Sequence, residues 1–232
     1  SSIPNGLSYI ITTKEMMTKE NLTQLRLQFL TNATERYDEL DEVAMALDGG
    51  CRWIQLRMKD ADDDKVIAVG RAAARLCHAR GAVLIIDDRV ALCHAIGADG
   101  VHLGRHDMPV DEARRLLGAG AIIGATVNTP DDLRRAAAAG ADYAGCGPFR
   151  FTTTKARLAP ILGLEGYERL VKVRDGLGRP LPLVAIGGIT IADVPSLMST
   201  GVDGVAISGC VVRAAEPVGA MRSLCRAMEE VG

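Results

Sequence analysis

The segment "AIGADGVHL", residues 95–103, has a pattern that returns twice, as "AAGADYAGC" at residues 138–146 and "STGVDGVAI" at residues 199–207. In each copy a glycine closes a helical stretch, and glycine suits the left-handed conformation that ends many helices. Two residues later an aspartate precedes a short apolar run of the kind that favours a strand. The repeat therefore predicts a fold built from recurring helix–turn–strand units.

Eight short apolar runs follow one another along the chain, separated by Ala-, Leu- and Arg-rich stretches such as residues 62–80 and 111–118. The runs cover residues 25–31, 51–57, 82–87, 99–104, 121–126, 142–147, 181–188 and 203–209. Strands that are apolar throughout indicate a parallel sheet covered by helices. Eight such units in about 210 residues predict an α/β fold, a single-domain (β/α)8 TIM barrel. A doubly wound open sheet is the alternative, but it needs fewer strands, and no G-x-G-x-x-G motif follows the first run.

The first residues do not fit the repeat. "LSYIIT" at residues 7–12 could form a strand, but residues 25–31 lead directly into the predicted helix at 37–50 and make the better first strand. We therefore expect residues 1–24 to be an N-terminal extension, either a helix that closes the barrel floor or a loose tail, and residues 25–232 to be the barrel domain.

Composition narrows the classes of partner. The formal net charge is −2 and aromatic residues make up 3% of the chain, which favours neither a nucleic acid nor an anionic membrane. Six cysteines lie in apolar runs without a C-x-x-C pair, as expected in a reducing cytoplasm. No apolar run approaches the roughly 18 residues of a membrane span. The composition therefore predicts a cytoplasmic protein with small-molecule partners. It does not decide whether the protein is a homo-oligomer.

A barrel of this kind carries its active site at the C-terminal ends of the strands. The seventh and eighth runs end in Gly187–Gly188 and Ser208–Gly209, where backbone N–H groups could approach a phosphate closely. The other interpretation is that the two glycines only form a tight turn.

The opposite part of the rim combines cations with carboxylates. Arg57, Lys59 and Lys155 follow separate strands, together with Asp88 and Asp107. These side chains could simply form ion pairs, but they also resemble a cradle for Mg²⁺ and a diphosphate, since Mg²⁺ takes one or two carboxylates and fills its remaining positions with water and phosphate oxygens. No nucleophile–base pair stands out, which suits a reaction in which a diphosphate leaves.

Four segments together resemble the thiamine-phosphate synthase family. They are "GGCRWIQLRMKD" (49–60), "IIDDRVALCHAIGADGVHLGRHDMPVDEARRLLG" (85–118), "GPFRFTTTKARLAPILGLEGY" (147–167) and "VAIGGIT" (184–190). The resemblance implies a transferase of thiamine biosynthesis. Such an enzyme condenses (4-amino-2-methyl-5-pyrimidinyl)methyl diphosphate with 4-methyl-5-(2-hydroxyethyl)thiazole phosphate, with Mg²⁺, through a dissociative step that releases diphosphate.

The resemblance also implies roles for individual residues. The pyrimidine diphosphate would contact Gln55, Arg57, Lys59, Asp87, Thr126 and Lys155, of which Arg57, Lys59 and Lys155 would be catalytic. The metal would be held by Asp88 and Asp107. The thiazole phosphate would contact Thr152, Thr153, Thr154, Gly188, Ile207 and Ser208.

Four positions depart from the family pattern. Met58 replaces an acid, Asn128 stands where histidine is common, Asp87 replaces an asparagine, and Thr126 replaces a serine. Three other functions remain in view: a thiazole tautomerase of the same superfamily, a non-catalytic barrel that binds a phosphorylated ligand, and a phosphosugar isomerase. A tautomerase would not need the residues that bind the metal and the diphosphate, namely Asp88, Asp107 and Lys155. A phosphosugar isomerase would need a catalytic pair of acids.

Overall fold

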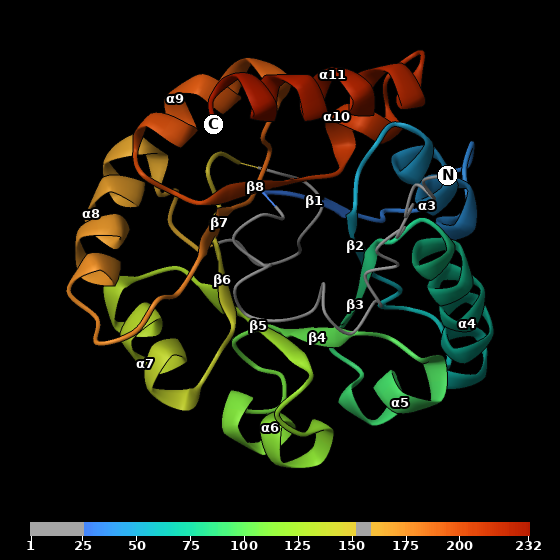
Figure 1. The fold of residues 1–232 in the computed structure, drawn as a ribbon, viewed down its shortest axis with the longest axis horizontal. Helices are drawn as coiled ribbons and strands as arrows, with labels where there is room; N and C mark the ends of the chain where they lie inside the picture. Colours follow the sequence, from blue (N-terminus) through green and yellow to red (C-terminus); the bar gives the residue numbers. More distant parts are fainter. Residues whose placement is uncertain (1–25, 152–158) are drawn as a thin grey trace, which may run out of the picture.

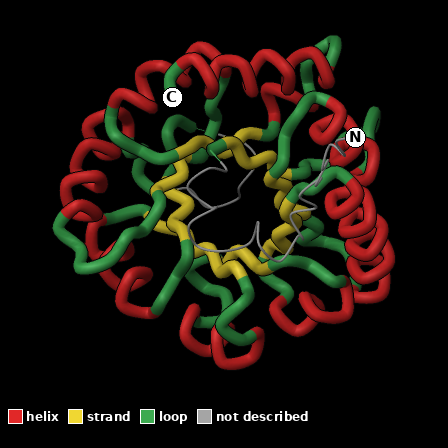
Figure 2. The backbone as a smooth tube through the Cα atoms, viewed as in Figure 1, coloured by secondary structure: helices red, strands yellow, loops and turns green. Residues whose placement is uncertain are grey.

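The computed structural model describes residues 26–151 and 159–232, and within them eight parallel strands close into a barrel in the order β1 to β8. Figures 1 and 2 show the strands as an inner ring and the helices as an outer ring. Neighbouring strands are consecutive in sequence, and β1 pairs with β8 to complete the closure. The predicted TIM barrel is confirmed, and the open-sheet alternative is excluded because the sheet has no edge.

Each strand falls in one of the eight apolar runs, and only β5 extends past its run, by one residue. The strands are β1 Leu27–Leu30, β2 Trp53–Leu56, β3 Val83–Asp87, β4 Gly100–Leu103, β5 Ile122–Val127, β6 Tyr143–Cys146, β7 Leu183–Ala185 and β8 Gly204–Ile207. Most runs are longer than their strands because they include the turn residues that carry the rim of the barrel. The extension predicted at residues 1–24 lies outside the described residues.

Helices separate the strands and form the outer layer. They are α3 Glu39–Asp48, α4 Asp63–Ala79, α5 Cys93–Ile96, α6 Val110–Leu117, α7 Pro130–Ala139, α8 Gly163–Asp175, α9 Val194–Ser199, α10 Gly209–Val212 and α11 Pro217–Glu230, with short 3₁₀ turns at Val90–Leu92 and Ile191–Asp193. None of the helices in the described part of the chain is long and apolar enough to cross a membrane.

Successive strand residues alternate between the barrel interior and the helices, as the two-residue period of a strand requires. The apolar cluster inside the barrel consists of Trp53, Val83, Ile85, Ile122, Tyr143, Val184 and Ala206. Larger apolar clusters lie between the strands and the outer helices. The interior also holds buried polar side chains, among them Gln28, Gln55 and His102.

The aspartates of the repeated segment tie the floor of the barrel together. Asp99, Asp142 and Asp203 stand just before β4, β6 and β8, and each accepts a hydrogen bond from a backbone N–H of the preceding strand, on Leu84, Ile123 and Leu183 respectively. Each carboxylate also pairs with a side chain of the helix that comes before this preceding strand. The partners are His78 for Asp99, Arg114 for Asp142 and Arg174 for Asp203. The sequence repeat thus marks a structural joint at the end of the barrel opposite the predicted site.

Candidate active site

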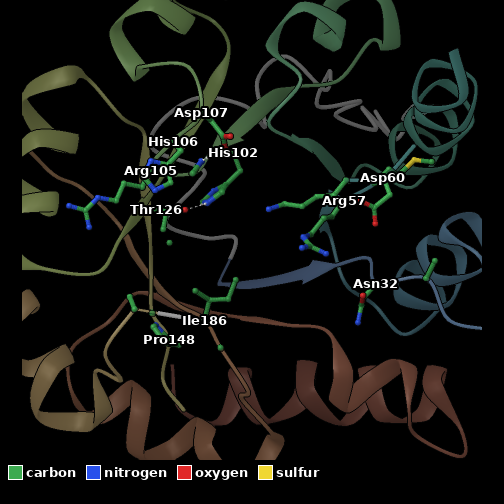
Figure 3. A pocket seen from close by; sticks show the side chains of 18 of the residues that line it. Asn32, Arg57, Asp60, His102, Arg105, His106, Asp107, Thr126, Pro148 and Ile186 are labelled. Atoms are coloured by element: carbon green, nitrogen blue, oxygen red, sulfur yellow. Dashed lines mark hydrogen bonds between the residues drawn. The ribbon is translucent and has the colours of Figure 1, made fainter. Parts of the chain in front are cut away.

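Two adjoining cavities open where the C-terminal ends of the strands meet the following loops. The first has a volume of about 1050 Å³ and is lined by residues that follow β1, β2, β4, β5, β6 and β7 (Figure 3). The second, of about 310 Å³, is lined mainly by residues that follow β7 and β8. Asn32, Arg57, Ile186 and Gly187 line both cavities, so the Arg57 side chain stands between them.

Asp107 lines the first cavity, and the Asp88 carboxyl lies close to it. Burial, and the negative charge of the nearby Asp107, raise the pKa of the Asp88 carboxyl above its ordinary value. Asp107 is held by the backbone N–H of Gly104 at 2.6 Å. Two acids in such proximity repel each other when ionised, and a bound cation relieves that repulsion.

Asp88 projects from an unusual piece of backbone. Asp88 and Arg89 have φ angles of 58° and 39°, in the left-handed region that costs a non-glycine residue about 1–2 kcal/mol. The Asp88 backbone N–H donates to the carbonyl of His102 on β4 at 2.8 Å. This conformation turns the chain sharply at the end of β3 and brings the Asp88 carboxyl to Asp107.

The Arg89 guanidinium holds the loop that carries Lys59. It donates to the Ala61 carbonyl and the Asp63 carboxylate, both at 2.6 Å, and to the carbonyls of Met58 and Lys59 at 3.3 Å. Sequence reasoning gave Arg89 no role. The signal was an arginine directly after an Asp–Asp pair at a strand end, which does not by itself reveal what the side chain reaches.

The cations of the first cavity differ in their surroundings. Arg57 leaves the end of β2 and its Nε lies 3.9 Å from the Asp87 carboxylate at the end of β3. Lys59 lines the same cavity with an exposed side chain. In Figure 3, Arg57 stands on one side of the cavity and Thr126 on the other. The first cavity therefore combines the positive charges of Arg57 and Lys59 with the Asp107 carboxylate.

The second cavity brings together Gly188, Ile207 and Ser208, three residues predicted to bind a monophosphate. The Ser208 hydroxyl oxygen is buried and has no hydrogen-bond partner among the described residues. Gly188 has a φ of 65°, a left-handed conformation that favours glycine, and an added Cβ would lie 2.5 Å from the Arg150 side chain. A buried unpaired hydroxyl costs free energy, and an anion in the cavity would supply its partner.

Arg213 also lines the second cavity, and sequence reasoning did not single it out. Its guanidinium lies over Gly209, where an added Cβ would come within 2.3 Å of the Nη2 atom. The Arg213 guanidinium makes no hydrogen bond or ion pair with another residue in the ranges 26–151 and 159–232. Its signal in the sequence, an arginine five residues after Ser208, is weak because arginine is common on exposed helical turns.

Arg150, by contrast, is occupied. It donates to both carboxylate oxygens of Asp193 and to the Gly188 carbonyl, each at 2.7 Å. It therefore fastens the loop after β6 to the turn after β7.

Comparisons with known proteins agree on one family. A family model described as "Thiamine monophosphate synthase" matches residues 27–211. The chain is 53% identical to a protein of Bacteroides fragilis named thiamine-phosphate synthase, over 84% of this chain and 95% of that protein. A protein of the same name from Phocaeicola vulgatus is 54% identical, over 84% of this chain and 93% of the other. The chain belongs to the thiamine-phosphate synthase family.

A solved structure extends the similarity to the fold. Thiamine phosphate pyrophosphorylase from Pyrococcus furiosus matches with a TM-score of 0.81 and 34% identity, covering 91% of this chain and 99% of that one. The barrel and the rim from which the two cavities are built are thus those of a member of the thiamine-phosphate synthase family.

Three departures from the family pattern find local explanations. Met58 is 8% exposed and packs into the apolar core, a setting in which an acid would be desolvated. Asn128 donates from Nδ2 to the Gly147 carbonyl at 2.6 Å and so supports the turn after β6. Asp87 faces Arg57, which stabilises a negative charge that an asparagine would lack.

The remaining predicted site residues divide into two groups. Thr126 lines the first cavity, whereas Gln55 is 2% exposed and lies inside the barrel, where it lines neither cavity. Thr152, Thr153, Thr154 and Lys155 lie outside the described residues, so their roles stay predictions.

Proposed function

We propose that this protein joins (4-amino-2-methyl-5-pyrimidinyl)methyl diphosphate to 4-methyl-5-(2-hydroxyethyl)thiazole phosphate, giving thiamine phosphate and diphosphate. The observation that carries the proposal is the pair of adjoining cavities, each with its own anion-binding groups, that meet at Arg57. Two phosphorylated substrates that react with each other need two such sites side by side. The names of the relatives at 50–54% identity support the same reaction.

The first cavity would hold the pyrimidine diphosphate. Its fit to Mg²⁺ rests on the Asp88–Asp107 pair, because Mg²⁺ characteristically binds one or two carboxylates together with phosphate oxygens. Bound there, Mg²⁺ would neutralise charge on the diphosphate as it leaves. Arg57 and Lys59, with Lys155, would bind the diphosphate oxygens through charge-assisted hydrogen bonds.

The second cavity would hold the thiazole phosphate. Gly188 offers backbone, Ser208 offers the unpaired hydroxyl, and Ile207 lines the wall. Arg213 adds a cation. Thr152, Thr153 and Thr154 would complete the site from the loop after β6.

The reaction needs a leaving-group clamp more than a base. The bond between the pyrimidine methylene carbon and the diphosphate oxygen breaks, and its electron pair leaves with the diphosphate. The lone pair of the thiazole nitrogen then forms the new bond to that carbon. This nitrogen carries no hydrogen, so no proton has to be removed, and the cations of the first cavity stabilise the departing charge.

We further propose a cytoplasmic location. The support is that all six cysteines are free thiols. Burial raises the pKa of the Cys51 and Cys77 thiols to about 12, which leaves them unreactive.

The decisive experiment supplies the purified protein with both phosphorylated substrates, with and without Mg²⁺, and measures thiamine phosphate and diphosphate. We expect both products in equal amounts, only when both substrates and the metal are present. Binding without diphosphate release would indicate a non-catalytic barrel, and conversion of the thiazole phosphate alone would indicate a tautomerase.

Variants locate the metal. Asp88→Asn and Asp107→Asn should each abolish Mg²⁺-dependent turnover, whereas Asp60→Asn, which removes an exposed carboxylate from the same cavity, should not. Wild-type activity in either of the first two variants would remove that residue from the metal site.

A further inference from the structure

A chain of hydrogen bonds crosses the barrel interior and ends at the first cavity. The Gln55 amide nitrogen lies 3.3 Å from Gln28 Oε1, and the Gln28 amide nitrogen lies 3.3 Å from the Tyr143 hydroxyl. That hydroxyl lies 2.8 Å from His102 Nδ1, and His102 Nε2 lies 3.1 Å from Thr126 Oγ1. Figure 3 shows the last of these bonds at the wall of the cavity. Five side chains from five strands thus form one path.

The barrel makes room for this path. Gly124 stands where a Cβ would lie 2.1 Å from the Tyr143 ring, and Gly145 stands where a Cβ would lie 2.9 Å from the His102 ring. The Trp53 ring packs edge-on against Tyr143 with centroids 4.9 Å apart. Glycine at two inward positions, next to two large polar rings, indicates a built arrangement rather than polar residues that happen to meet.

With the Gln28 amide nitrogen turned toward Tyr143, as in the structure, the donors and acceptors give the path one direction. Because the Gln28 amide donates to the Tyr143 oxygen, the single hydroxyl hydrogen of Tyr143 is available for His102. His102 Nδ1 then accepts, so the hydrogen of the neutral ring is on Nε2, which donates to Thr126 Oγ1. Because Thr126 Oγ1 accepts this hydrogen bond from His102, the hydroxyl hydrogen of Thr126 is left to point into the cavity.

We propose that Gln28, Tyr143 and His102 are positioning residues that set Thr126 as a hydrogen-bond donor toward the substrate. The part of the substrate beside Thr126 must then be an acceptor, a ring nitrogen or a phosphate oxygen, and not an amino group. For the proposed pyrimidine substrate, on which this step rests, the ring would turn a nitrogen toward Thr126. Its amino group would then be left for an acceptor such as the Asp87 carboxyl.

The same five groups could be bonded in the opposite direction. In that arrangement the Gln28 amide oxygen accepts from Tyr143, His102 carries its hydrogen on Nδ1, and Thr126 donates to His102. Thr126 would then present only lone pairs to the cavity and would select a donor. The position of the hydrogen on the His102 ring therefore distinguishes the two directions.

Nitrogen-15 NMR of the histidine-labelled full chain measures that position directly. The chain has four histidines, and variants at His78, His94 and His106 assign the His102 signals. The pH is set well above the ordinary imidazole pKa of about 6.5. We expect the Nε2–H form in the wild-type protein. An Nδ1–H form or a doubly protonated ring would overturn the proposal, and this measurement needs neither substrate nor a variant of the path itself.

Two tyrosine variants test the path. Tyr143→Phe removes the donor to Nδ1 and should shift His102 toward the Nδ1–H form. Tyr167→Phe is the matched control, because Tyr167 is equally buried but its hydroxyl donates to the backbone carbonyl of Cys146. The control should keep the Nε2–H form. An unchanged His102 spectrum in folded Tyr143→Phe would contradict the role of Tyr143.

Kinetics adds the functional consequence. Loss of one neutral hydrogen bond to the substrate changes kcat/KM by roughly three- to tenfold. We therefore expect Tyr143→Phe to lower kcat/KM for the pyrimidine diphosphate by about that factor, with the KM for the thiazole phosphate unchanged and Tyr167→Phe at wild-type activity. Equal losses for both substrates would contradict the positioning role. If the wild-type protein shows no synthase activity, the proposed function fails, while the NMR result still decides the direction of the hydrogen bonds.

Discussion

Substitution of Gly104 by alanine should weaken the metal site without unfolding the barrel. A Cβ at this position would lie 2.8 Å from Asp107 Oδ2, and the next contact, with Asp107 Cγ, is at 3.6 Å. Van der Waals contact begins at about 3.4 Å, so the carboxylate oxygen must move by about half an ångström. That oxygen is the end of a flexible side chain, and its movement disturbs no packed core.

The magnitude follows from the geometry of the metal. Mg²⁺ requires carboxylate oxygens at about 2.0–2.1 Å and tolerates deviations of only about 0.2 Å. A displacement of half an ångström exceeds this range, and the hydrogen bond from the Gly104 N–H that orients Asp107 is strained at the same time. Loss of a group that orients a metal ligand typically costs about 10- to 100-fold in metal affinity. We expect the Mg²⁺ concentration for half-maximal turnover to rise by that factor.

The assay is a titration of turnover with Mg²⁺ at saturating substrates, accompanied by calorimetric titration of Mg²⁺ in the presence of diphosphate. Gly120→Ala is the matched control, since nothing lies within 4 Å of the added Cβ. Thermal melting should be similar for Gly104→Ala and wild type. A folded Gly104→Ala enzyme with the wild-type Mg²⁺ dependence would refute the placement of Asp107 in the metal site.

Three other predictions follow from single contacts. Arg89→Ala should release the loop that carries Lys59 and lower kcat/KM for the diphosphate substrate by about tenfold, the value of one charge-assisted hydrogen bond made by Lys59. Steady-state kinetics with each substrate varied in turn measures this effect, and a rise in the KM for the thiazole phosphate instead would contradict it. Ser208→Ala should mainly raise the KM for the thiazole phosphate, and an effect on Mg²⁺ dependence would contradict that. The hydrogen bond to Asp99 raises the pKa of His78, so His78 stabilises the fold most below its ordinary pKa of about 6.5 and loses this contribution as the pH rises through the raised value. Chemical unfolding of His78→Gln should therefore show a larger loss of stability at about pH 6 than at about pH 9, and an equal loss at both would contradict the pairing.

The fold was predictable because one short sequence pattern, a glycine followed two residues later by an aspartate that precedes a strand, occurs three times. Asp99 and its two counterparts bind the backbone of the preceding strand, and a joint of this kind needs the same spacing each time. The strand limits were less predictable. Residues such as Gly187 and Gly188 extend the apolar run of β7 but belong to the turn that lines the cavities. Gly187 is half-buried and Gly188 is exposed, so an apolar run does not by itself mark where a strand ends.

The candidate site was predictable where its chemistry depends on residue type. Carboxylates and cations at strand ends are conspicuous, and the structure brings Asp88 to Asp107 and Arg57 to the junction of the two cavities. The path from Gln28 to Thr126 was not predicted. Its signal was a polar residue at an inward position of each of five strands, but the partner of such a residue lies on another strand, and sequence order does not reveal the register.

The backbone at Asp88 and Arg89 shows how the rim uses stability supplied elsewhere. Two consecutive left-handed residues cost about 1–2 kcal/mol each. The conformation is held from two sides, by the bond from the Asp88 N–H to the His102 carbonyl and by the four bonds of the Arg89 guanidinium.

The result of this strain is specific. One turn directs Asp88 to Asp107 and Arg89 to the loop of Lys59, so that the proposed metal site and a diphosphate-binding cation are positioned by adjacent residues. Relaxing the turn would move both groups together. The two parts of the proposed diphosphate site are therefore mechanically coupled. A substitution that removes the hydrogen bonds of the Arg89 guanidinium should change the Mg²⁺ dependence of turnover as well as substrate binding.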